Sequence, residues 1–292
     1  MAAENPFEQL EARLAALEEE VKRLSNIVNP AFSVSNITAA VAGPMLKETA
    51  QHQFNARFFA LLDIGEASLK YSAGIAFAWS INKGHAQAND VMEMFKQFPS
   101  FGKWAEMLRR ILDDPSNTGW PVDIVRAAFK SPDGKPTAIA RYLLDEFISL
   151  RNKERGHGAQ QPEGHYESLY RGNTLIIQDC VAALRHLEIP LVYVHAADNL
   201  TNKCAYKTIR LMGAAPTSSA EPIVTTVKVA VGSTCLWDGS DSLLPLGGFI
   251  THRYCPTCGL EHMFFAERIT ADKLSCHSYV GGHRLTISLN PK

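Results

Sequence analysis

The spacing of apolar residues changes at Pro190, and this change constrains the fold more than any other feature of the sequence. From about Asn36 to Leu187, apolar residues recur at helical spacing, and Gly and Pro fall mainly between the periodic segments. After Pro190 the pattern becomes short β-rich runs separated by turns. The sequence therefore predicts an α+β protein, in which a helical bundle is followed by a small antiparallel sheet or barrel-like domain of about 100 residues.

The helical region is expected to form an up-and-down bundle of roughly four to five helices. The predicted helices are residues 51–82, 101–112, 122–129, 137 to about 152, and 164–187. The predicted strands are residues 191–195, 223–231, 234–237, 248–253, 261–268, 273–279 and 285–289. The most apolar long stretch, residues 64–81, contains Glu66 and Lys70, so it fits a buried bundle helix better than a membrane span.

The N-terminal segment carries a heptad pattern. Its apolar residues alternate at spacings of three and four: Phe7, Leu10, Leu14, Leu17, Val21, Leu24 and Val28. Asn5 is a suitable helix cap and Asn29-Pro30 ends the helix. This pattern favours a two-stranded parallel coiled coil, and thus a homodimer or a higher homo-oligomer. The alternative is one amphipathic helix that folds back on its own chain.

Three domains are expected: a coiled-coil helix over residues 1–30, a helical bundle over 31–189 and a β-rich domain over 190–292. The 29 Lys and Arg against 30 Asp and Glu predict no general attraction to nucleic acid or to anionic lipid, so any RNA contact requires a local basic patch. The absence of a secretory signal pattern and the six cysteines spread through the second half favour a protein of the cytoplasm that is not membrane-bound.

The residues with the clearest chemical potential lie where the fourth predicted helix ends. Arg151, Lys153 and Arg155 place three cations within five residues, and His157 follows between two glycines. On a regular helix Arg151 and His157 would lie about 240° apart, so they converge only if the helix ends near Gly156. Arginine is suited to phosphate and histidine exchanges protons near neutral pH, which are the requirements for cleaving a phosphodiester with a ribose 2′-hydroxyl.

Arg151-Asn152 followed by His157 fits the R-N-x4-H motif, and the chain thereby resembles the HEPN superfamily (higher eukaryotes and prokaryotes nucleotide-binding). The upstream Asp63-Ile64-Gly65-Glu66, the downstream Tyr166 and a Cys-Pro-x-Cys-Gly sequence also look like a bacterial subgroup of that superfamily. The resemblance implies a metal-independent endoribonuclease in which two protomers form one cleft. Arg151 and His157 would be catalytic and RNA products would end in 2′,3′-cyclic phosphate.

The same resemblance implies further roles and a setting. Asn152 would orient the catalytic pair, and Lys153 and Arg155 would hold neighbouring phosphates of the RNA. HEPN proteins are frequent in toxin–antitoxin and antiphage systems, which suggests a defence effector with a regulatory protein partner.

Other functions remain open from the sequence. Arg151 can instead cap its helix end and His157 bond the loop, which would give a non-catalytic HEPN-fold scaffold or sensor that dimerises and binds partners. A third alternative is a nucleotide-binding or nucleic-acid-reading β domain. The sequence contains no P-loop, no G-x-G-x-x-G and no H-E-x-x-H motif, so P-loop hydrolysis and zinc-protease chemistry are poor candidates.

Cys255-Pro256-Thr257-Cys258-Gly259 has the form of a zinc knuckle, in which a tight turn brings two thiolates together. A structural zinc ion requires two more ligands, because a second knuckle is missing. The candidates are Cys276, His277, Cys235, His252, His262 and His283. A degenerate turn without metal, or a redox-active or free thiol pair, are the alternatives. No cofactor is expected for catalysis.

Overall fold

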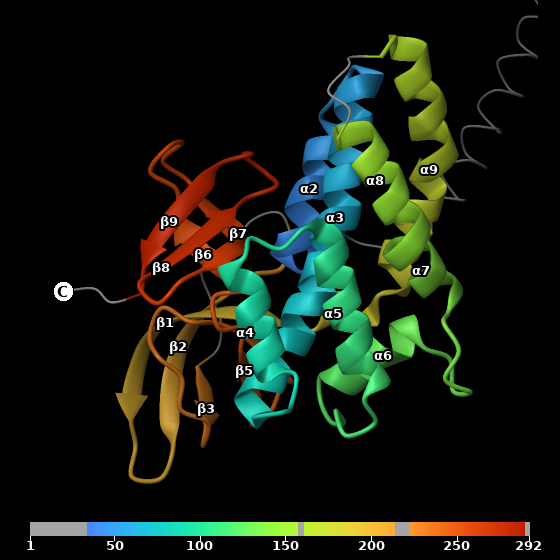
Figure 1. Cartoon of the computed structure of the whole chain (residues 1–292). Helices are drawn as coiled ribbons and strands as arrows, with labels where there is room; N and C mark the ends of the chain where they lie inside the picture. The colour runs from blue at the N-terminus through green and yellow to red at the C-terminus, as the bar shows by residue number, and fades with distance from the viewer. Residues whose placement is uncertain (1–33, 157–160, 214–221, 290–292) are drawn as a thin grey trace, which may run out of the picture.

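The computed structural model describes residues 34–156, 161–213 and 222–289. These residues form helices followed by antiparallel sheets, which confirms the predicted α+β class (Figure 1). The predicted coiled coil, at residues 1–30, and His157 both lie outside the described residues.

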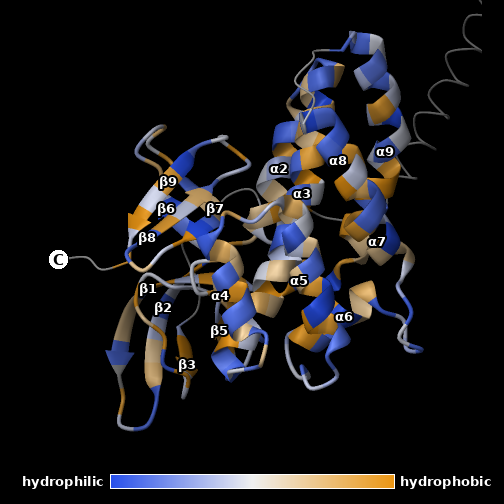
Figure 2. Cartoon of the chain, in the orientation of Figure 1, coloured by the Kyte–Doolittle hydropathy of each residue, from blue (hydrophilic) through white to orange (hydrophobic). Residues whose placement is uncertain are grey.

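The long helix α3 (Phe54–Lys83) forms the centre of the helical part. It is buried along most of its length, and it contacts α2 (Ala39–Thr49), α5 (Phe101–Asp113) and α9 (Glu163–Ala183). The shorter α4 (Ala88–Lys96) and α6 (Val122–Phe129) also pack against it. Blue and orange residues alternate along α5, α6 and α9 in Figure 2, as expected for helices that bury one face. Two short helical turns, η1 (Val34–Asn36) and η3 (Arg185–Glu188), flank this part of the chain.

A continuous helical run joins α7 (Ala138–Arg141), the π-helical turn η2 (Tyr142–Glu146) and α8 (Phe147–Gly156). It begins where the Thr137 side chain accepts a hydrogen bond from the Ala140 N–H at 3.1 Å. The helix extends at least to Gly156, the last described residue before the gap at 157–160, and so beyond the end predicted near Asn152.

Gly65 leaves space on α3 for the ring of Phe147. A Cβ atom at this position would overlap the ring of Phe147, the first residue of α8. Phe147 is fully buried, so the ring has no space into which to retreat. The absence of a side chain at Gly65 therefore sets the distance between the two helices that carry the charged residues described below.

The C-terminal region forms two antiparallel sheets, where one small sheet or barrel was expected. The first has the order β3-β2-β1-β4-β5, formed by Leu191–Asn199 (β1), Cys204–Arg210 (β2), Ile223–Thr225 (β3), Thr234–Trp237 (β4) and Leu243–Pro245 (β5). The second has the order β6-β7-β8-β9, formed by Ile250–Tyr254 (β6), Glu261–Ile269 (β7), Lys273–His277 (β8) and Arg284–Ser288 (β9).

The four-stranded sheet shares its core with the helices. Phe249, which precedes β6, lies 5.7 Å from Phe77 of α3 and 5.1 Å from Phe95 of α4 between ring centroids. The five-stranded sheet instead buries part of its surface in a separate small cluster that includes Val194 and Tyr206. In the described part of the chain, no helix combines the length and the apolar character needed to cross a membrane.

Candidate functional site

Three charged residues lie on one face of the largely buried helix α3. Asp63, Glu66 and Lys70 are spaced by three and four positions, so their side chains project to the same side. All three residues are buried, and the Glu66 side chain is only 3% exposed. Because a buried charge is costly without a partner, this face requires charged or hydrogen-bonding groups from neighbouring elements.

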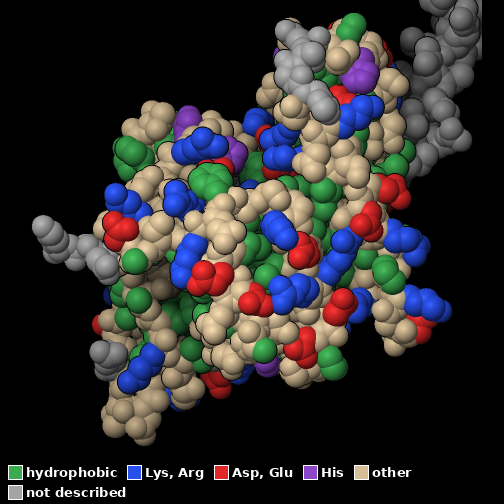
Figure 3. Space-filling model, viewed as in Figure 1, with side chains coloured by type: hydrophobic (Ala, Val, Ile, Leu, Met, Phe, Trp, Pro, Cys, Tyr) green, Lys and Arg blue, Asp and Glu red, His purple; other side chains and the backbone are tan. Residues whose placement is uncertain are grey.

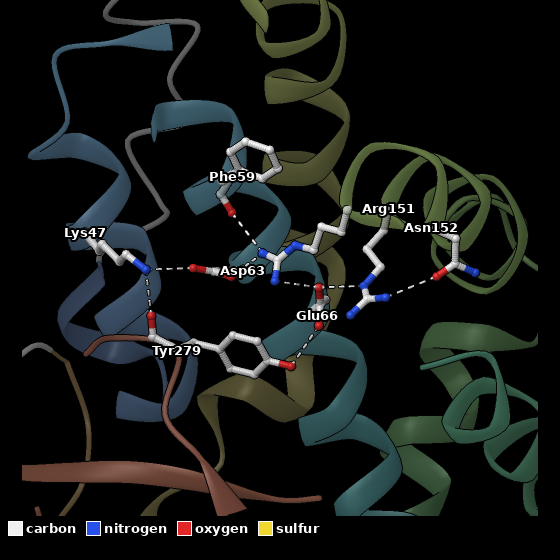
Figure 4. Close-up of polar contacts among 8 residues, drawn as sticks. Lys47, Phe59, Asp63, Glu66, Arg151, Asn152 and Tyr279 are labelled. Atoms are coloured by element: carbon white, nitrogen blue, oxygen red, sulfur yellow. Dashed lines mark hydrogen bonds and ion pairs between the residues drawn. The ribbon is translucent and has the colours of Figure 1, made fainter. Parts of the chain in front are cut away.

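Helix α8 supplies two arginines to this face (Figure 4). Arg151 and Arg155 are one helical turn apart and therefore point the same way. Arg151 donates a hydrogen bond from Nε to Oε1 of Glu66 at 2.8 Å, and Nη1 of Arg155 lies 3.3 Å from the same oxygen. Arg155 also donates to Asp63 and, at 3.2 Å, to the carbonyl oxygen of Phe59. Glu66 thus lies between the two guanidinium groups.

The other partners come from the two ends of the described chain. Lys47 of α2 donates from Nζ to Oδ2 of Asp63 at 2.8 Å and to the carbonyl oxygen of Tyr279 at 3.0 Å. The Tyr279 hydroxyl donates to Oε2 of Glu66 at 3.0 Å (Figure 4). We call Lys47, Asp63, Glu66, Lys70, Arg151, Arg155 and Tyr279 the ion cluster.

The protonation states within the ion cluster follow from burial and charge. Burial alone would raise the pKa of Glu66, but Arg155, Arg151 and Lys70 outweigh it and hold that pKa below its ordinary value. Burial, reinforced by Glu66, raises the pKa of the Tyr279 hydroxyl well above its ordinary value. At neutral pH, Glu66 is therefore a carboxylate, and the protonated Tyr279 hydroxyl donates a hydrogen bond to it.

Lys70 has no room to reach solvent. Its Nζ lies 5.4 Å from the ring centroid of Trp104 and 5.3 Å from that of Tyr279. Burial lowers its pKa, an effect that Glu66 partly offsets. The rings and the carboxylate together stabilise the ammonium group in this buried position.

A cavity of about 630 Å³ lies beside the ion cluster. Its lining includes Lys47, Phe59, Arg155, Tyr166, His277 and Tyr279. Figure 3 shows Lys and Arg side chains gathered around the hollow between the helices and the four-stranded sheet. Arg151 is not part of this lining and lies on the Asn152 side of Glu66 (Figure 4). The ion cluster therefore presents Lys47 and Arg155 to the cavity and Arg151 outside it.

Among the described residues, those predicted from the R-N-x4-H motif and its surroundings lie on two different faces of α8. Arg151 is 27% exposed at its side chain, and its Nη1 donates to Oδ1 of Asn152 at 3.2 Å. Within the described residues, Nη2 of Arg151 has no hydrogen-bond partner. Asn152 and Lys153 are exposed, and Lys153 lies about 200° around the helix from Arg151. The structure therefore brings Arg151, Asn152 and Arg155 together and directs Lys153 away from them.

Sequence reasoning did not identify Lys47 as a site residue and did not connect Tyr279 with the carboxylates of α3. Asp63 and Glu66 entered only as part of the family resemblance, although two carboxylates on an apolar helix signal a need for cationic partners. Nothing in the local sequence around Lys47 or Tyr279 indicates that they are those partners, because they are 232 residues apart.

A second cluster lies at one end of the four-stranded sheet. The ligand atoms of Cys255, Cys258 and His283 all lie within 4.8 Å of one another, and no other such group of three is present in the described residues. Sγ of Cys255 is 3.3 Å from Nδ1 of His283. Gly259 takes the left-handed conformation, with φ 75°, which glycine adopts without strain in a tight turn. We call Cys255, Cys258 and His283 the thiol–imidazole cluster, and these three residues can hold a metal ion.

Four of the remaining sequence candidates for metal ligation, Cys235, Cys276, His252 and His277, are not members of this group. Burial raises the pKa of both Cys235 and Cys276 to about 12, which disfavours the thiolate that binds metals. His252 lies 3.7 Å from Glu261, and His277 lines the cavity beside the ion cluster. For Cys255, by contrast, the backbone N–H groups of Cys258 and Thr257 outweigh the effect of burial and lower the thiol pKa to about 7.

Comparisons of the chain with protein-family models, with curated proteins and with solved structures find no match. The ion cluster and the thiol–imidazole cluster are therefore the basis for a functional proposal.

Proposed function

We propose that the chain is a metal-independent endoribonuclease of the HEPN type that acts as a homodimer. The observation that carries this proposal is the position of Arg151. Its guanidinium group is fixed by the buried Glu66 near the end of α8, six residues before His157. An arginine held in this way can bind a phosphate without first losing much conformational freedom.

The proposed reaction is an internal transfer at phosphorus. The ribose 2′-oxygen attacks the adjacent phosphorus, the bond to the 5′-oxygen breaks, and a 2′,3′-cyclic phosphate and a 5′-hydroxyl form. His157 acts as general acid or general base, and Arg151 neutralises the charge of the phosphate. In a dimer, His157 of one protomer can accept the 2′-hydroxyl proton while His157 of the other protonates the leaving oxygen. Asn152 orients the guanidinium group through its contact with Arg151.

The local charge balance supports binding of a polyanion. The ion cluster contains four cationic side chains and two carboxylates, whereas the whole chain has a net charge of −1. Glu154 also lines the cavity, and its Oε2 atom lies 3.1 Å from Nε2 of His165. The exposed Lys153 is free to reach RNA outside the cavity, and Arg155 contributes its charge from a position fixed by Asp63.

The proposal extends to the setting of the protein. The predicted coiled coil over residues 1–30 would hold two bundles together and raise their effective concentration. The HEPN resemblance makes the chain a candidate toxin or antiphage effector in the cytoplasm, with a regulatory protein that controls it.

One observation favours a second candidate function. Arg151 and Arg155 are both ion-paired with buried carboxylates, which is also how arginines fasten two helices together. On this alternative the chain is a non-catalytic HEPN-fold scaffold or sensor, and the ion cluster has a structural role only.

Cleavage of bulk RNA that contains tRNA, in the presence of EDTA, tests the proposal. The wild type is expected to cleave and to leave 2′,3′-cyclic phosphate ends, whereas His157→Ala and Arg151→Ala are expected to be inactive but folded. His195→Ala, which alters an exposed histidine of β1, is the matched control and is expected to cleave normally. Full cleavage by His157→Ala would refute the proposal. Absence of cleavage by every protein would favour the scaffold, for which deletion of residues 1–30 should abolish assembly.

The thiol–imidazole cluster has no place in this reaction. We propose that Cys255 and Cys258, together with His283, hold a zinc ion that stabilises the four-stranded sheet. The three side chains and their spacing match the ligand types of structural zinc sites.

A further inference from the structure

His262 lies beside Cys258 and is the histidine nearest to the position that a fourth metal ligand would take. Its Nε2 atom is 3.0 Å from Sγ of Cys258, and its ring centroid is 6.1 Å from that of His283. In tetrahedral zinc sites, bonds of about 2.3 Å to sulfur and about 2.0 Å to nitrogen place the two ligand atoms roughly 3.6 Å apart. The 3.0 Å and 3.3 Å sulfur–nitrogen distances of the two pairs are close to that value. His262 is outside the group whose ligand atoms all lie within 4.8 Å of one another, so its ring must move toward Cys255 and His283 when the metal binds.

The sheet topology explains why these four residues meet. Cys255 and Cys258 lie in the turn between β6 and β7, and His262 is the second residue of β7. His283 immediately precedes β9, at the end of the turn that follows β8. In an antiparallel β6-β7-β8-β9 sheet, the β6–β7 and β8–β9 turns lie at the same end, so a metal there would tie the two turns together.

The turn over residues 278–283 also carries Tyr279 to the ion cluster. The turn is closed by hydrogen bonds from the Ser278 N–H to the His283 carbonyl oxygen and from the Gly282 N–H to the Ser278 carbonyl oxygen, each 2.9 Å. Tyr279 is 2% exposed and contacts both Glu66 and Lys47 (Figure 4).

The same turn packs against helix α2. The next residue, Val280, is so close to α2 that a Cβ at Gly43 would lie 2.5 Å from its Cγ2 atom. The turn therefore contacts the helices through its side chains and the metal-ligand group through His283. Because His283 and Tyr279 belong to the same short turn, a displacement of His283 also displaces Tyr279 in the ion cluster.

We propose that Cys255, Cys258, His262 and His283 bind one zinc ion and that this ion holds the 278–283 turn in the position that places Tyr279 against Glu66 and Lys47. Two thiolates and two neutral imidazoles around Zn²⁺ give a site without net charge, which suits the buried position of Cys255. Each thiol releases its proton to solvent when the metal binds. The metal thus takes no part in the proposed RNA chemistry and still stabilises the ion cluster.

The metal part of this proposal is tested by the zinc content of the full-length protein and by competition with a chromophoric chelator. We expect one zinc ion per chain. Cys258→Ser and His262→Ala should each weaken binding by more than the roughly 10- to 100-fold that loss of an outer-shell partner costs. The matched control His195→Ala should bind as the wild type does. Cobalt in place of zinc should give the visible absorption of a tetrahedral site with two thiolates, which tests the ligand set even if a variant fails to fold. Wild-type affinity in His262→Ala would exclude His262 as a ligand, and less than one zinc per chain would overturn the site.

The coupling part is tested by hydrogen exchange in the full-length protein, with zinc bound and after chelation. Exchange in the 278–283 turn and in the α2 segment around Lys47 should rise when zinc is removed. Tyr279→Phe should retain zinc and show faster exchange around Glu66 with the metal bound. Unchanged exchange after complete zinc removal would overturn the coupling. None of these measurements uses RNA, so the zinc proposal can be confirmed or refuted even if the chain has no ribonuclease activity. Any loss of RNA cleavage upon zinc removal would rest on that proposed function.

Discussion

The ion cluster and the thiol–imidazole cluster differ in how far apart in the sequence their members lie. The ion cluster joins α2, α3, α8 and the turn after β8, and its contact between Lys47 and Tyr279 spans 232 residues. In the thiol–imidazole cluster, Cys255 and Cys258 come from one tight turn and are joined by a single distant residue, His283. A cluster of the first kind exists only when the whole fold has formed, whereas the second begins as a local turn.

The two clusters also differ in what stabilises them. In the ion cluster, buried charges neutralise one another, so each member depends on the others. In the thiol–imidazole cluster the ligand atoms converge on a single point that a metal ion can occupy. The predictions below concern the first cluster and the helices that carry it.

The largest effect is expected when the central carboxylate is neutralised. Glu66→Gln leaves Arg151, Arg155 and Lys70 without their shared counter-charge, and loss of one partner of a buried pair costs about 3 to 5 kcal/mol. Urea unfolding at pH 7 measures this loss. Glu93→Gln removes an exposed pair with Lys96 and should cost less than about 1 kcal/mol. Equal losses in the two variants would show that the ion cluster contributes no more than a surface pair.

A smaller effect is expected from the spacing of α3 and α8. Gly65→Ala introduces a methyl group against the Phe147 ring, and overpacking of this kind costs about 1 to 3 kcal/mol. Thermal unfolding of Gly65→Ala, of Phe147→Leu and of the double variant forms a double-mutant cycle, in which the shorter side chain should partly rescue the alanine.

The control for this cycle is Gly172→Ala on α9, where an added Cβ meets no atom within 4 Å. This variant should be stabilised by about 0.5 to 1 kcal/mol, because alanine favours the helix. Strict additivity of Gly65→Ala and Phe147→Leu would mean that the ring does not set the helix spacing.

Acidification should weaken the ion cluster through Glu66. The pKa of this carboxyl is below its ordinary value of 4.5 in the folded protein, so its contribution to stability is present above pH 4.5 and is lost as the pH falls through the folded pKa. The stability difference between wild type and Glu66→Gln should therefore shrink at low pH. Urea unfolding of both proteins from pH 7 to pH 3 checks this, and a difference that grows on acidification would contradict it.

The smallest effect on stability is expected at Lys153. Because this side chain is exposed, Lys153→Ala should change the free energy of unfolding by no more than about 0.5 kcal/mol. If Lys153 contacts one RNA phosphate, the slope of log affinity against log salt should fall by about 0.7 for single-stranded RNA. Fluorescence anisotropy over a salt series measures this slope. Arg155→Ala, by contrast, is expected to lower the free energy of unfolding strongly, because Arg155 is paired with the buried Asp63 and Glu66.

The elements predicted best from the sequence are those with local signals at both ends. The helix over 122–129 and the strand over 234–237 have the predicted bounds, and α5 begins at Phe101 after Ser100, whose side chain accepts from the Lys103 N–H. Two strands were not predicted, Cys204–Arg210 and Leu243–Pro245. The division into two sheets was not predicted either, because strand pairing depends on contacts that a one-dimensional pattern does not contain.

The candidate site shows the same limit. The motif residues Arg151, Asn152 and Arg155 were found because they are close together in the sequence, and Cys255 and Cys258 for the same reason. Lys47 and Tyr279 were not found, because only the packed fold brings them to Asp63 and Glu66. The roles of His157 and of the heptad over residues 1–30 stay predictions, since both lie outside the described residues.

The wide separation of Lys47 and Tyr279 has a consequence for protein synthesis. A ribosome makes the helices long before it makes β8 and the turn that follows, so a nascent chain carries Arg151, Arg155 and Glu66 before it carries Tyr279. During that interval the carboxylate lacks one of its hydrogen-bond donors, and Lys47 lacks one of its acceptors. Chains that terminate before β8 would therefore contain every helix that the structure describes and still lack a completed ion cluster, so the site is assembled late in synthesis.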